Sequence, residues 1–334
     1  MRKFNLKGKV AQKLKGLETA VSEDQNAEND TNVSTQNQPA TVALEHGEIH
    51  YAWRTDVGRI RKNNQDSVIL GNRLFGVADG MGGHNGGEIA SAGLRDGLLR
   101  ETEGKEPSAE LLEGAIKKVN YEIWEQQEKD ASLTGMGTTL TILWPTAKEM
   151  IIGQVGDSRA YLIRDNQMKQ VTSDHSMVAD MVRRGVLTEE QAACHPMRNY
   201  ITRAVGTDDT IEVDILSIPR MNGDRWIVCS DGLYGQISKQ ELEETAKTAD
   251  LEEAAGKLLV LALEHGGKDN ISFIIMDDMN DIRGLSDRLP KPLRHHEEKD
   301  DDIDSTVEEE PEKEDNAAEN TVPGNSDQEG VSAE

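Results

Sequence analysis

The middle of the chain contains three short apolar runs separated by turns of only a few residues, at 137–144, 150–155 and 160–163. In the first run Leu140, Ile142 and Trp144 fall on one face of an extended chain, which is the two-residue period of a β-strand. Strands joined by such short turns run antiparallel, because a parallel connection needs a crossover of a dozen residues or more. This part of the sequence therefore predicts an antiparallel meander of three strands.

Other apolar runs predict further buried strands at 74–78, 226–229 and 271–276. Apolar residues with helical spacing occur in three separate segments, through 89–98, 112–123 and 251–262. The predicted helices fall between groups of strands and do not alternate with single strands. This order favours an α+β domain whose sheets are covered by helices, and it disfavours a parallel βαβ array.

Charge is distributed unevenly along the 334 residues, whose formal net charge is −25. Residues 295–334 contain 16 acidic and 2 basic residues, a net of −14, and residues 1–49 contain 6 basic and 7 acidic ones, a net of −1. The remaining residues, 50–294, therefore carry −25 + 14 + 1 = −10. The acidic end has too few large apolar residues to offset the chain entropy lost on folding. We predict a folded domain at 48–285 between a basic, then polar, extension at 1–47 and a disordered acidic tail at 286–334.

The two ends leave alternatives open. The basic start has Phe4, Leu6 and Val10 on one possible helical face, which suits an acidic membrane or partner, although a short solvated helix is favoured. The acidic tail suits either a pseudo-substrate that competes with phosphate or a solubilising segment, and the second is favoured. Two cysteines, no membrane-spanning apolar run and no signal-peptide core predict a cytoplasmic protein.

Four aspartates share one local context, beside a glycine or small polar residue at the edge of an apolar strand. They are Asp79 in VADGMGGH, Asp157 in QVGDSRAY, Asp231 in IVCSDGLYG and Asp269 in GGKDNISFII. A single aspartate beside glycine is usually a turn former. Four of them at strand ends indicate carboxylates that converge from distant parts of the chain.

Converging carboxylates raise one another's pKa unless positive charge lies among them. Two divalent cations supply +4 against the −4 of the four aspartates. All-oxygen ligation favours Mg²⁺ or Mn²⁺ over zinc, which more often recruits His and Cys. Two such ions activate water and neutralise charge on a phosphoryl group.

The chain also resembles a known family over almost the whole predicted domain. Eight stretches carry the resemblance: TDVGRIRKNNQDS (55–67), ADGMGGHNGGE (78–88), MGTTL (136–140), GDSRAY (156–161), TSDHS (172–176), HPMRNYITRAVG (195–206), CSDGL (229–233) and GGKDNIS (266–272). In this order they resemble the metal-dependent protein phosphatases of type 2C, the PPM family, in their compact bacterial form. The resemblance implies a β-sandwich of two antiparallel sheets flanked by helix pairs, in α-β-β-α layers.

The same resemblance implies roles for individual residues. Asp79 bridges two metal ions and the Gly80 carbonyl binds one of them. Asp231 and Asp269 complete the second ion's ligands, and Asp157 binds a third, weaker ion. Arg61 holds the substrate phosphate, for which the guanidinium fork is suited. The residues that orient metal-bound water are Gln65, Asp66 and Asn270.

Other matching positions carry less chemistry. Thr138 and Thr139 are predicted to pack near the site, and 177–206 to form a flap beside it. His175 and His195, at the flap's edges, are predicted to have structural hydrogen-bonding roles. Cys229, inside an apolar run, is predicted to be a small buried hydrophobe.

Two positions depart from the best-known members of the family. Gln65 stands where many members have Glu, and a neutral amide there should weaken metal affinity modestly. Met81 stands where the eukaryotic type has a histidine thought to protonate the leaving group, so water or another acid must do so here. Neither departure removes a direct carboxylate ligand.

Three functions remain in consideration. The first is hydrolysis of phosphoserine and phosphothreonine on proteins, opposing a serine/threonine kinase in signal transduction, with phosphoproteins as partners. We expect a monomer that does not bind nucleic acid. The second is a catalytically weak pseudophosphatase that binds phosphoproteins as a scaffold, suggested by Gln65 and the long tails. The third is a phosphatase within a partner-switching system that has one dedicated substrate.

Overall fold

A computed structural model describes residues 40–44, 47–82 and 86–279 of the chain. The predicted acidic tail and nearly all of the predicted extension at 1–47 lie outside these ranges. The strand β1 (Ala40–Ala43) nevertheless falls inside that extension, because its backbone pairs with β2 (Glu48–Asp56) from Ala40 opposite Tyr51 to Ala43 opposite Glu48. Within the described ranges, no helix is long and apolar enough to cross a membrane.

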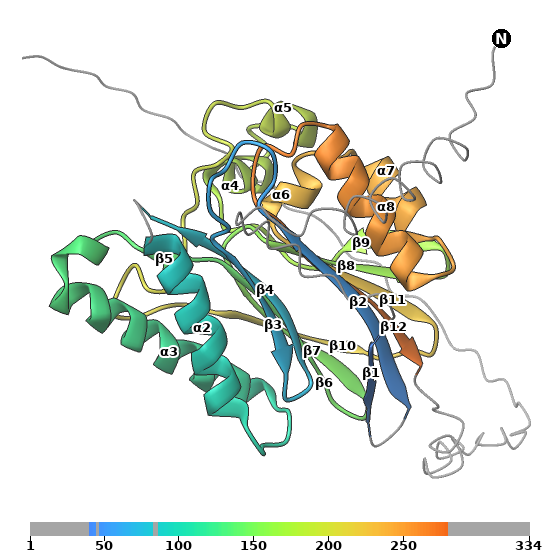
Figure 1. The fold of residues 1–334 in the computed structure, drawn as a ribbon, viewed down its shortest axis with the longest axis horizontal. Helices are drawn as coiled ribbons and strands as arrows, with labels where there is room; N and C mark the ends of the chain where they lie inside the picture. Colours follow the sequence, from blue (N-terminus) through green and yellow to red (C-terminus); the bar gives the residue numbers. More distant parts are fainter. Residues whose placement is uncertain (1–39, 45–46, 83–85, 280–334) are drawn as a thin grey trace, which may run out of the picture. The chain divides into compact units, whose positions relative to one another are not determined.

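Two antiparallel sheets form the centre of the domain (Figure 1). The first has the order β1-β2-β12-β11-β8-β9. Its other strands are β12 (Ile271–Met279), β11 (Asp224–Cys229), β8 (Arg159–Arg164) and β9 (Gln167–Gln170). The second sheet has the order β10-β7-β6-β4-β3, and a short β5 pairs with β4. Its strands are β10 (Asp214–Pro219), β7 (Glu149–Val155), β6 (Leu140–Pro145), β4 (Leu74–Met81), β3 (Asp66–Gly71) and β5 (Gly137–Thr138).

The predicted three-stranded meander is correct for its first hairpin and wrong for its third strand. β6 pairs with β7, with Leu140 opposite Val155. β8 instead joins the other sheet, where it pairs with β11 and β9. The chain changes sheets at a turn where Gly156 has φ of +94°, a conformation that glycine adopts without strain. A period of two residues identifies a strand, but it does not say to which sheet the strand belongs.

A hydrophobic core fills the space between the sheets. Both faces of β7 are buried, which explains its continuous apolar run: Met150 and Ile152 pack into the inter-sheet core, while Ile151 and Val155 pack toward helices. Trp226 is fully buried between the sheets. Full burial of a large apolar side chain contributes about 1.5–3 kcal/mol, so these positions dominate the stability of the sandwich.

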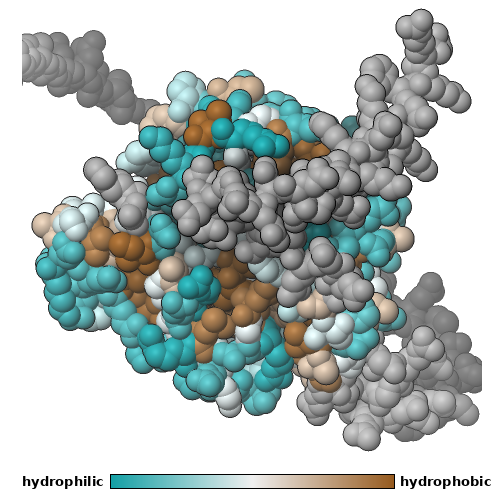
Figure 2. Space-filling view, in the orientation of Figure 1, coloured by the Kyte–Doolittle hydropathy of each residue, from teal (hydrophilic) through white to brown (hydrophobic). Residues whose placement is uncertain are grey.

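Helices cover the outer face of each sheet, which confirms the predicted α-β-β-α layers (Figure 1). Against the second sheet lie α2 (Gly86–Thr102) and α3 (Ala109–Lys129), followed by the short η1 (Ala131–Leu133). In the region of α2 and α3, Figure 2 shows a hydrophilic outer edge with hydrophobic patches inside it. Ser108 begins α3 by accepting a hydrogen bond from the N–H of Leu111 at 3.1 Å.

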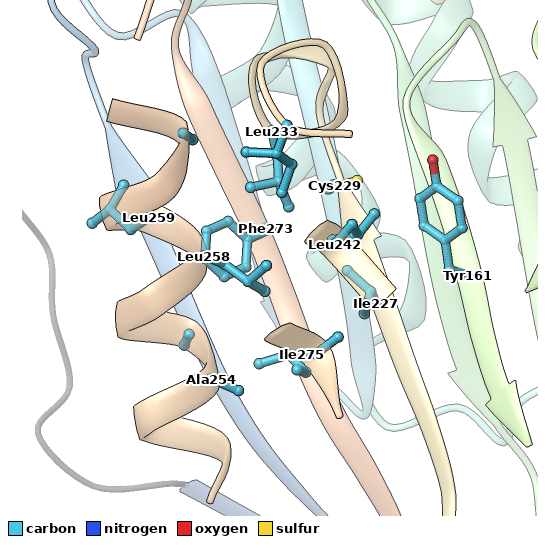
Figure 3. Packing of buried hydrophobic residues seen from close by; sticks show 14 of the residues in the cluster. Tyr161, Ile227, Cys229, Leu233, Leu242, Ala254, Leu258, Leu259, Phe273 and Ile275 are labelled. Atoms are coloured by element: carbon cyan, nitrogen blue, oxygen red, sulfur yellow. The ribbon is translucent and has the colours of Figure 1, made fainter. Parts of the chain in front are cut away.

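The first sheet is covered by three helices, α6 (Asp231–Tyr234), α7 (Lys239–Ala246) and α8 (Leu251–Glu264). Figure 3 shows Ala254 and Leu258 of α8 on the side of the helix that faces Phe273 and Ile275 of β12. Cys229 lies in this cluster and is fully buried, and burial raises the pKa of its thiol to about 12. The thiol is therefore protonated at neutral pH, in agreement with the predicted hydrophobic role.

Candidate active site

The predicted aspartates lie at the ends of strands from both sheets. Asp79 lies near the end of β4, and Asp157 lies in the turn from β7 to β8. Asp231 begins α6 directly after β11, while Asp269 precedes β12. Asp66, at the start of β3, stands opposite Asp79 in the pairing of β3 with β4. Antiparallel pairing thus brings strand starts and strand ends to one edge of the sandwich.

The aspartates lie close enough together for the charge of each to affect the pKa of its neighbours. Burial raises the pKa of Asp79 well above its ordinary value, and the charges of Asp66, Asp231, Asp157 and Asp269 raise it further. Four carboxylates from separate strands and turns therefore lie close enough to Asp79 to disfavour its ionised form.

The neighbouring carboxylates are perturbed in the same direction. Burial raises the pKa of Asp66 to about 7, although hydrogen bonds from Ser272 and Ser230 act against the shift. Burial, followed by the charge of Asp231, raises the pKa of Asp157 to about 7. Burial and the charge of Asp269 raise the pKa of Asp231 to about 6, while a hydrogen bond from Asp79 lowers it. Perturbation on this scale is typical of functional sites.

Two buried oxygens in this group suit a cation. Oδ1 of Asp66 and Oδ1 of Asp231 are both buried without a hydrogen-bond partner. An unpaired buried carboxylate oxygen is costly, and a divalent metal ion is a partner that removes the cost. The donors are all oxygen, which fits Mg²⁺ or Mn²⁺.

The carboxylates do not yet surround a single point. Among the described residues, no group of three or more His, Cys, Asp or Glu side chains is arranged to hold a metal ion. Two contacts engage the side chains of the group. Asp79 hydrogen-bonds to Asp231, and Nη2 of Arg61 donates to Oδ2 of Asp269 at 2.7 Å. The residue types and charges fit metal ions.

Backbone packing around Gly80 excludes any side chain there. A Cβ at Gly80 would lie 2.0 Å from the carbonyl oxygen of Gly87, and the Gly80 N–H donates to the Gln65 carbonyl at 3.1 Å. The start of α2 is thus pressed against the end of β4. Only glycine permits this approach, which fixes the backbone next to Asp79.

Asn270 ties the loop that carries Arg61 to the strand that follows Asp269. Its Nδ2 donates to the carbonyls of Val57 and Asn63 at 3.0 and 2.9 Å. Its Oδ1 accepts from the N–H of Gln65 at 2.9 Å. Each of these contacts is with the backbone, so Asn270 positions the loop that joins β2 to β3. The motif GGKDNIS marked this residue, but sequence alone did not reveal the loop contacts.

A network around Asp157 was not predicted from sequence. Arg159 forms a two-nitrogen contact with Asp174 and stacks over the ring of Tyr234, with Cζ 3.7 Å from the ring centroid. The Tyr234 hydroxyl donates to the Asp157 carbonyl at 2.9 Å. Thr139 Oγ1 accepts from the N–H of Asp79 at 2.9 Å and contacts Ser158 Oγ at 2.7 Å, in agreement with the predicted position of Thr139 near the site. The matched stretches GDSRAY and TSDHS pointed to this region without indicating its contacts.

The predicted flap contains α4 (Met177–Arg183) and α5 (Glu189–Ala193). His175, just before it, is buried, and its Nδ1 accepts a hydrogen bond from the N–H of Gly156 at 3.1 Å. His195 is half-buried, and its Nδ1 accepts from the N–H of Met197 at 3.1 Å. Both histidines have the structural hydrogen bonds that were predicted for them.

A family model described as protein phosphatase 2C matches residues 59–262, more than half of the chain. The chain belongs to the protein phosphatase 2C family. The matched range includes Arg61, Asp79, Asp157 and Asp231, and it ends before Asp269.

Individual members of the protein phosphatase 2C family are similar to this chain. The serine/threonine protein phosphatase PstP of Mycobacterium tuberculosis is 39% identical over 232 residues, which cover 69% of this chain and 45% of PstP. The chain thus spans less than half the length of that relative. The serine/threonine phosphatase stp of Listeria monocytogenes is 36% identical over 241 residues, which cover 69% of this chain and 96% of stp.

A solved structure supports the same membership. The catalytic domain of PstP in complex with two manganese ions matches with a TM-score of 0.65 and 36% identity. The match covers 70% of this chain and 99% of that one. Both proteins therefore share the two-sheet fold of the protein phosphatase 2C family.

Proposed function

We propose that this protein is a metal-dependent phosphatase that hydrolyses phosphoserine and phosphothreonine on other proteins. The buried carboxylates at one edge of the sandwich, with Arg61 beside them, support this function most directly. The similar proteins PstP and stp are named serine/threonine phosphatases, which agrees with the proposal. We further propose that the protein opposes a serine/threonine kinase in the cytoplasm and acts as a monomer.

The carboxylates have different roles in this proposal. Asp79, whose pKa is raised by burial and by the charges of the other four aspartates, is suited to bridge two ions, with the Gly80 carbonyl as a further ligand. Asp231 and Asp269 belong to the second ion, and Asp157 to a weaker third one. Mn²⁺ and Mg²⁺ both fit the oxygen donors, and manganese is present in the similar PstP structure. When bound, the two ions activate water and neutralise phosphoryl charge.

Arg61 binds and orients the phosphate. Its side chain is 48% exposed, so its guanidinium is accessible to a substrate on the surface of another protein. Only Nη2 contacts Asp269. An incoming phosphate competes with Asp269 for the guanidinium, because phosphate oxygens match its fork and carry more charge. Asp66, Gln65 and Asn270 hold the surrounding loop and water positions.

A scaffold without efficient catalysis is the second candidate. It is suggested by the neutral Gln65, which stands where many members of the family have a glutamate, and by the long segments on either side of the domain. Such a protein would bind phosphoproteins through Arg61 and release them unchanged. A phosphatase with one dedicated substrate would instead turn over one phosphoprotein and ignore generic peptides.

Hydrolysis of p-nitrophenyl phosphate with Mn²⁺ tests the proposal. Turnover should be removed by EDTA and reduced at least a hundredfold in Asp231→Asn, because a ligand of the essential ion is lost. Asp165→Asn is a matched control, since Asp165 is an exposed turn residue with φ of +51° that Asn also adopts. Folded, manganese-loaded protein that binds a phosphopeptide without turnover would establish the scaffold instead.

A further inference from the structure

The rim of the proposed site carries cations that the proposed chemistry does not use. Segments 57–62 and 266–269 are in direct contact there. The Arg59 N–H donates to the Gly267 carbonyl at 2.6 Å, and a Cβ on Gly267 would lie 3.1 Å from Cγ of Arg59. The Arg59 stem therefore lies against Gly267, close to the pair formed by Arg61 and Asp269.

Three of these cations, Arg59, Lys62 and Lys268, are called the rim cations below. Each is exposed, and each is one or two residues from Arg61 or Asp269 in the sequence. None of the three has an ion-pair or hydrogen-bond partner for its side chain among the described residues.

Several other arginines of the domain form ion pairs with aspartates. Arg159 contacts Asp174, Arg164 contacts Asp224, and Arg225 contacts Asp277. Acidic residues outnumber basic ones by 25 in the whole chain, so anionic partners are abundant. Arg59, Lys62 and Lys268, exposed and without such a partner in the part of the chain that the structure describes, are therefore available to an anion from outside the domain.

The rim cations do not serve the buried aspartates. The cations with the largest effect on Asp231 are Arg61 and Arg159, which lower its pKa. The rim cations are not among the main influences on Asp66, Asp79 or Asp157 either.

An apolar side chain lies among them. Ile60, between Arg59 and Arg61, is 70% exposed, the largest value among the exposed large hydrophobic residues that the structure describes. A single exposed isoleucine is common on protein surfaces. This one directly precedes the arginine proposed to bind phosphate, where a bound peptide would cover it.

We propose that the rim cations and Ile60 select phosphoproteins in which acidic side chains flank the phosphorylated residue and an apolar side chain packs on Ile60. This inference rests on the proposed function, because it assumes that Arg61 holds the phosphate. An extended peptide advances about 3.3 Å per residue, so neighbours within three positions lie within about 10 Å of the phosphate. Exposed charges interact appreciably within about one Debye length, about 8 Å at physiological ionic strength, so the rim cations act on those neighbours that come within this distance of them.

Three phosphothreonine peptides of equal length, with acidic, neutral or basic flanks, test the selection. The wild-type protein should hydrolyse the acidic peptide with kcat/KM about tenfold above the neutral one, and added salt should reduce this ratio. In Arg59→Gln/Lys62→Gln/Lys268→Gln the ratio should fall close to one. In Ile60→Ala, peptides with an apolar neighbour should lose their advantage over those with alanine there.

A matched control removes the same charge elsewhere. Lys105→Gln/Lys148→Gln/Lys169→Gln changes three exposed lysines after α2, between β6 and β7, and on β9. This variant should keep the preference for acidic peptides. An equal ratio in the rim variant and the control variant would overturn the inference.

Two readouts separate this inference from the proposed function. Hydrolysis of p-nitrophenyl phosphate, which has no flanking residues, should be unchanged in the rim variant. If that hydrolysis is absent even in the wild type, the proposed function fails, and binding of the labelled acidic phosphopeptide by fluorescence anisotropy still tests the rim. Equal affinity of wild type and rim variant for that peptide would then overturn the inference.

Discussion

Nη2 of Arg61 donates to Oδ2 of Asp269 across 2.7 Å, although the two residues are 208 positions apart in the chain. One is the proposed phosphate ligand and the other a proposed metal ligand. The guanidinium proposed to bind phosphate is therefore paired with the carboxylate proposed to bind a metal ion. Because both side chains are partly exposed, the pair is readily exchanged for stronger partners.

This pairing predicts opposite effects of one substitution on two ligands. Arg61→Met should lower kcat/KM for p-nitrophenyl phosphate by about 10²–10³-fold, because a donor to the developing phosphoryl charge is lost. The same variant should bind Mn²⁺ a few-fold more tightly, since Asp269 no longer has a competing cation. Calorimetric titration with Mn²⁺ measures the second effect. Unchanged or weaker manganese binding would show that the pair does not restrain Asp269.

Stability without metal should depend on pH in a definite direction. In the folded protein the pKa values of Asp66 and Asp157 are about 7 and that of Asp231 is about 6, above the ordinary value of 3.8. The folded state therefore keeps protons that the unfolded chain has already released between about pH 4 and pH 7. Stability in EDTA should fall as pH rises from 5 to 8.

Thermal unfolding at several pH values measures this dependence. Added Mn²⁺ should raise Tm more at pH 8 than at pH 5, because ionised carboxylates bind the metal and protonated ones do not. Asp157→Asn should flatten the slope in EDTA, whereas the exposed Asp165→Asn should leave it unchanged. A Tm in EDTA that rises between pH 5 and pH 8 would contradict the raised pKa values.

Asn270→Ala should destabilise the fold and loosen the loop that carries Arg61. The substitution leaves the Gln65 N–H and the carbonyls of Val57 and Asn63 without their present partner. Loss of these three partly buried hydrogen bonds costs about 2–4 kcal/mol in the free energy of unfolding. Urea unfolding measures the cost, with the exposed Asn222→Ala as a control near zero. A cost as small as that of the control would mean that the loop holds its shape without Asn270.

Two glycines on the paired helices α2 and α3 should respond to alanine with opposite signs. A Cβ at Gly97 would lie 2.6 Å from Cγ1 of Val119, whereas a Cβ at Gly114 would meet no atom within 4 Å. Gly97→Ala should destabilise the protein by about 1–3 kcal/mol through overpacking. Gly114→Ala should stabilise it by about 0.5–1 kcal/mol through helix propensity. Chemical denaturation of both variants measures the difference, and a shared sign would show that α2 and α3 separate easily.

Some of the site was accessible from sequence because its residues stand in short, local patterns. Asp79, Asp157, Asp231 and Asp269 each lie at the edge of an apolar run, and the end of a strand is a local property. Arg61 became a candidate only through the resemblance to a family, because a surface arginine between Arg59 and Lys62 has no distinctive local pattern.

Other features depend on contacts between distant segments. The tie from Asn270 to Val57 and Asn63 spans more than 200 residues. The stacking of Arg159 on Tyr234, and the hydroxyl that Tyr234 directs to Asp157, also join separate elements. No period or motif encodes such pairs.

The sequence alone determined the α+β class, most of the strands and the set of acidic residues, since apolar periodicity and charge act over a few neighbouring residues. Only the tertiary structure decided that β8 leaves the sheet of β6 and β7. It also decided that Arg61 pairs with Asp269 and that the rim cations have no partner among the described residues. The physical reason is that burial, desolvation and the interaction of charges depend on which segments pack together. The packing of the segments is set by the free energy of the whole domain, and local sequence does not determine it.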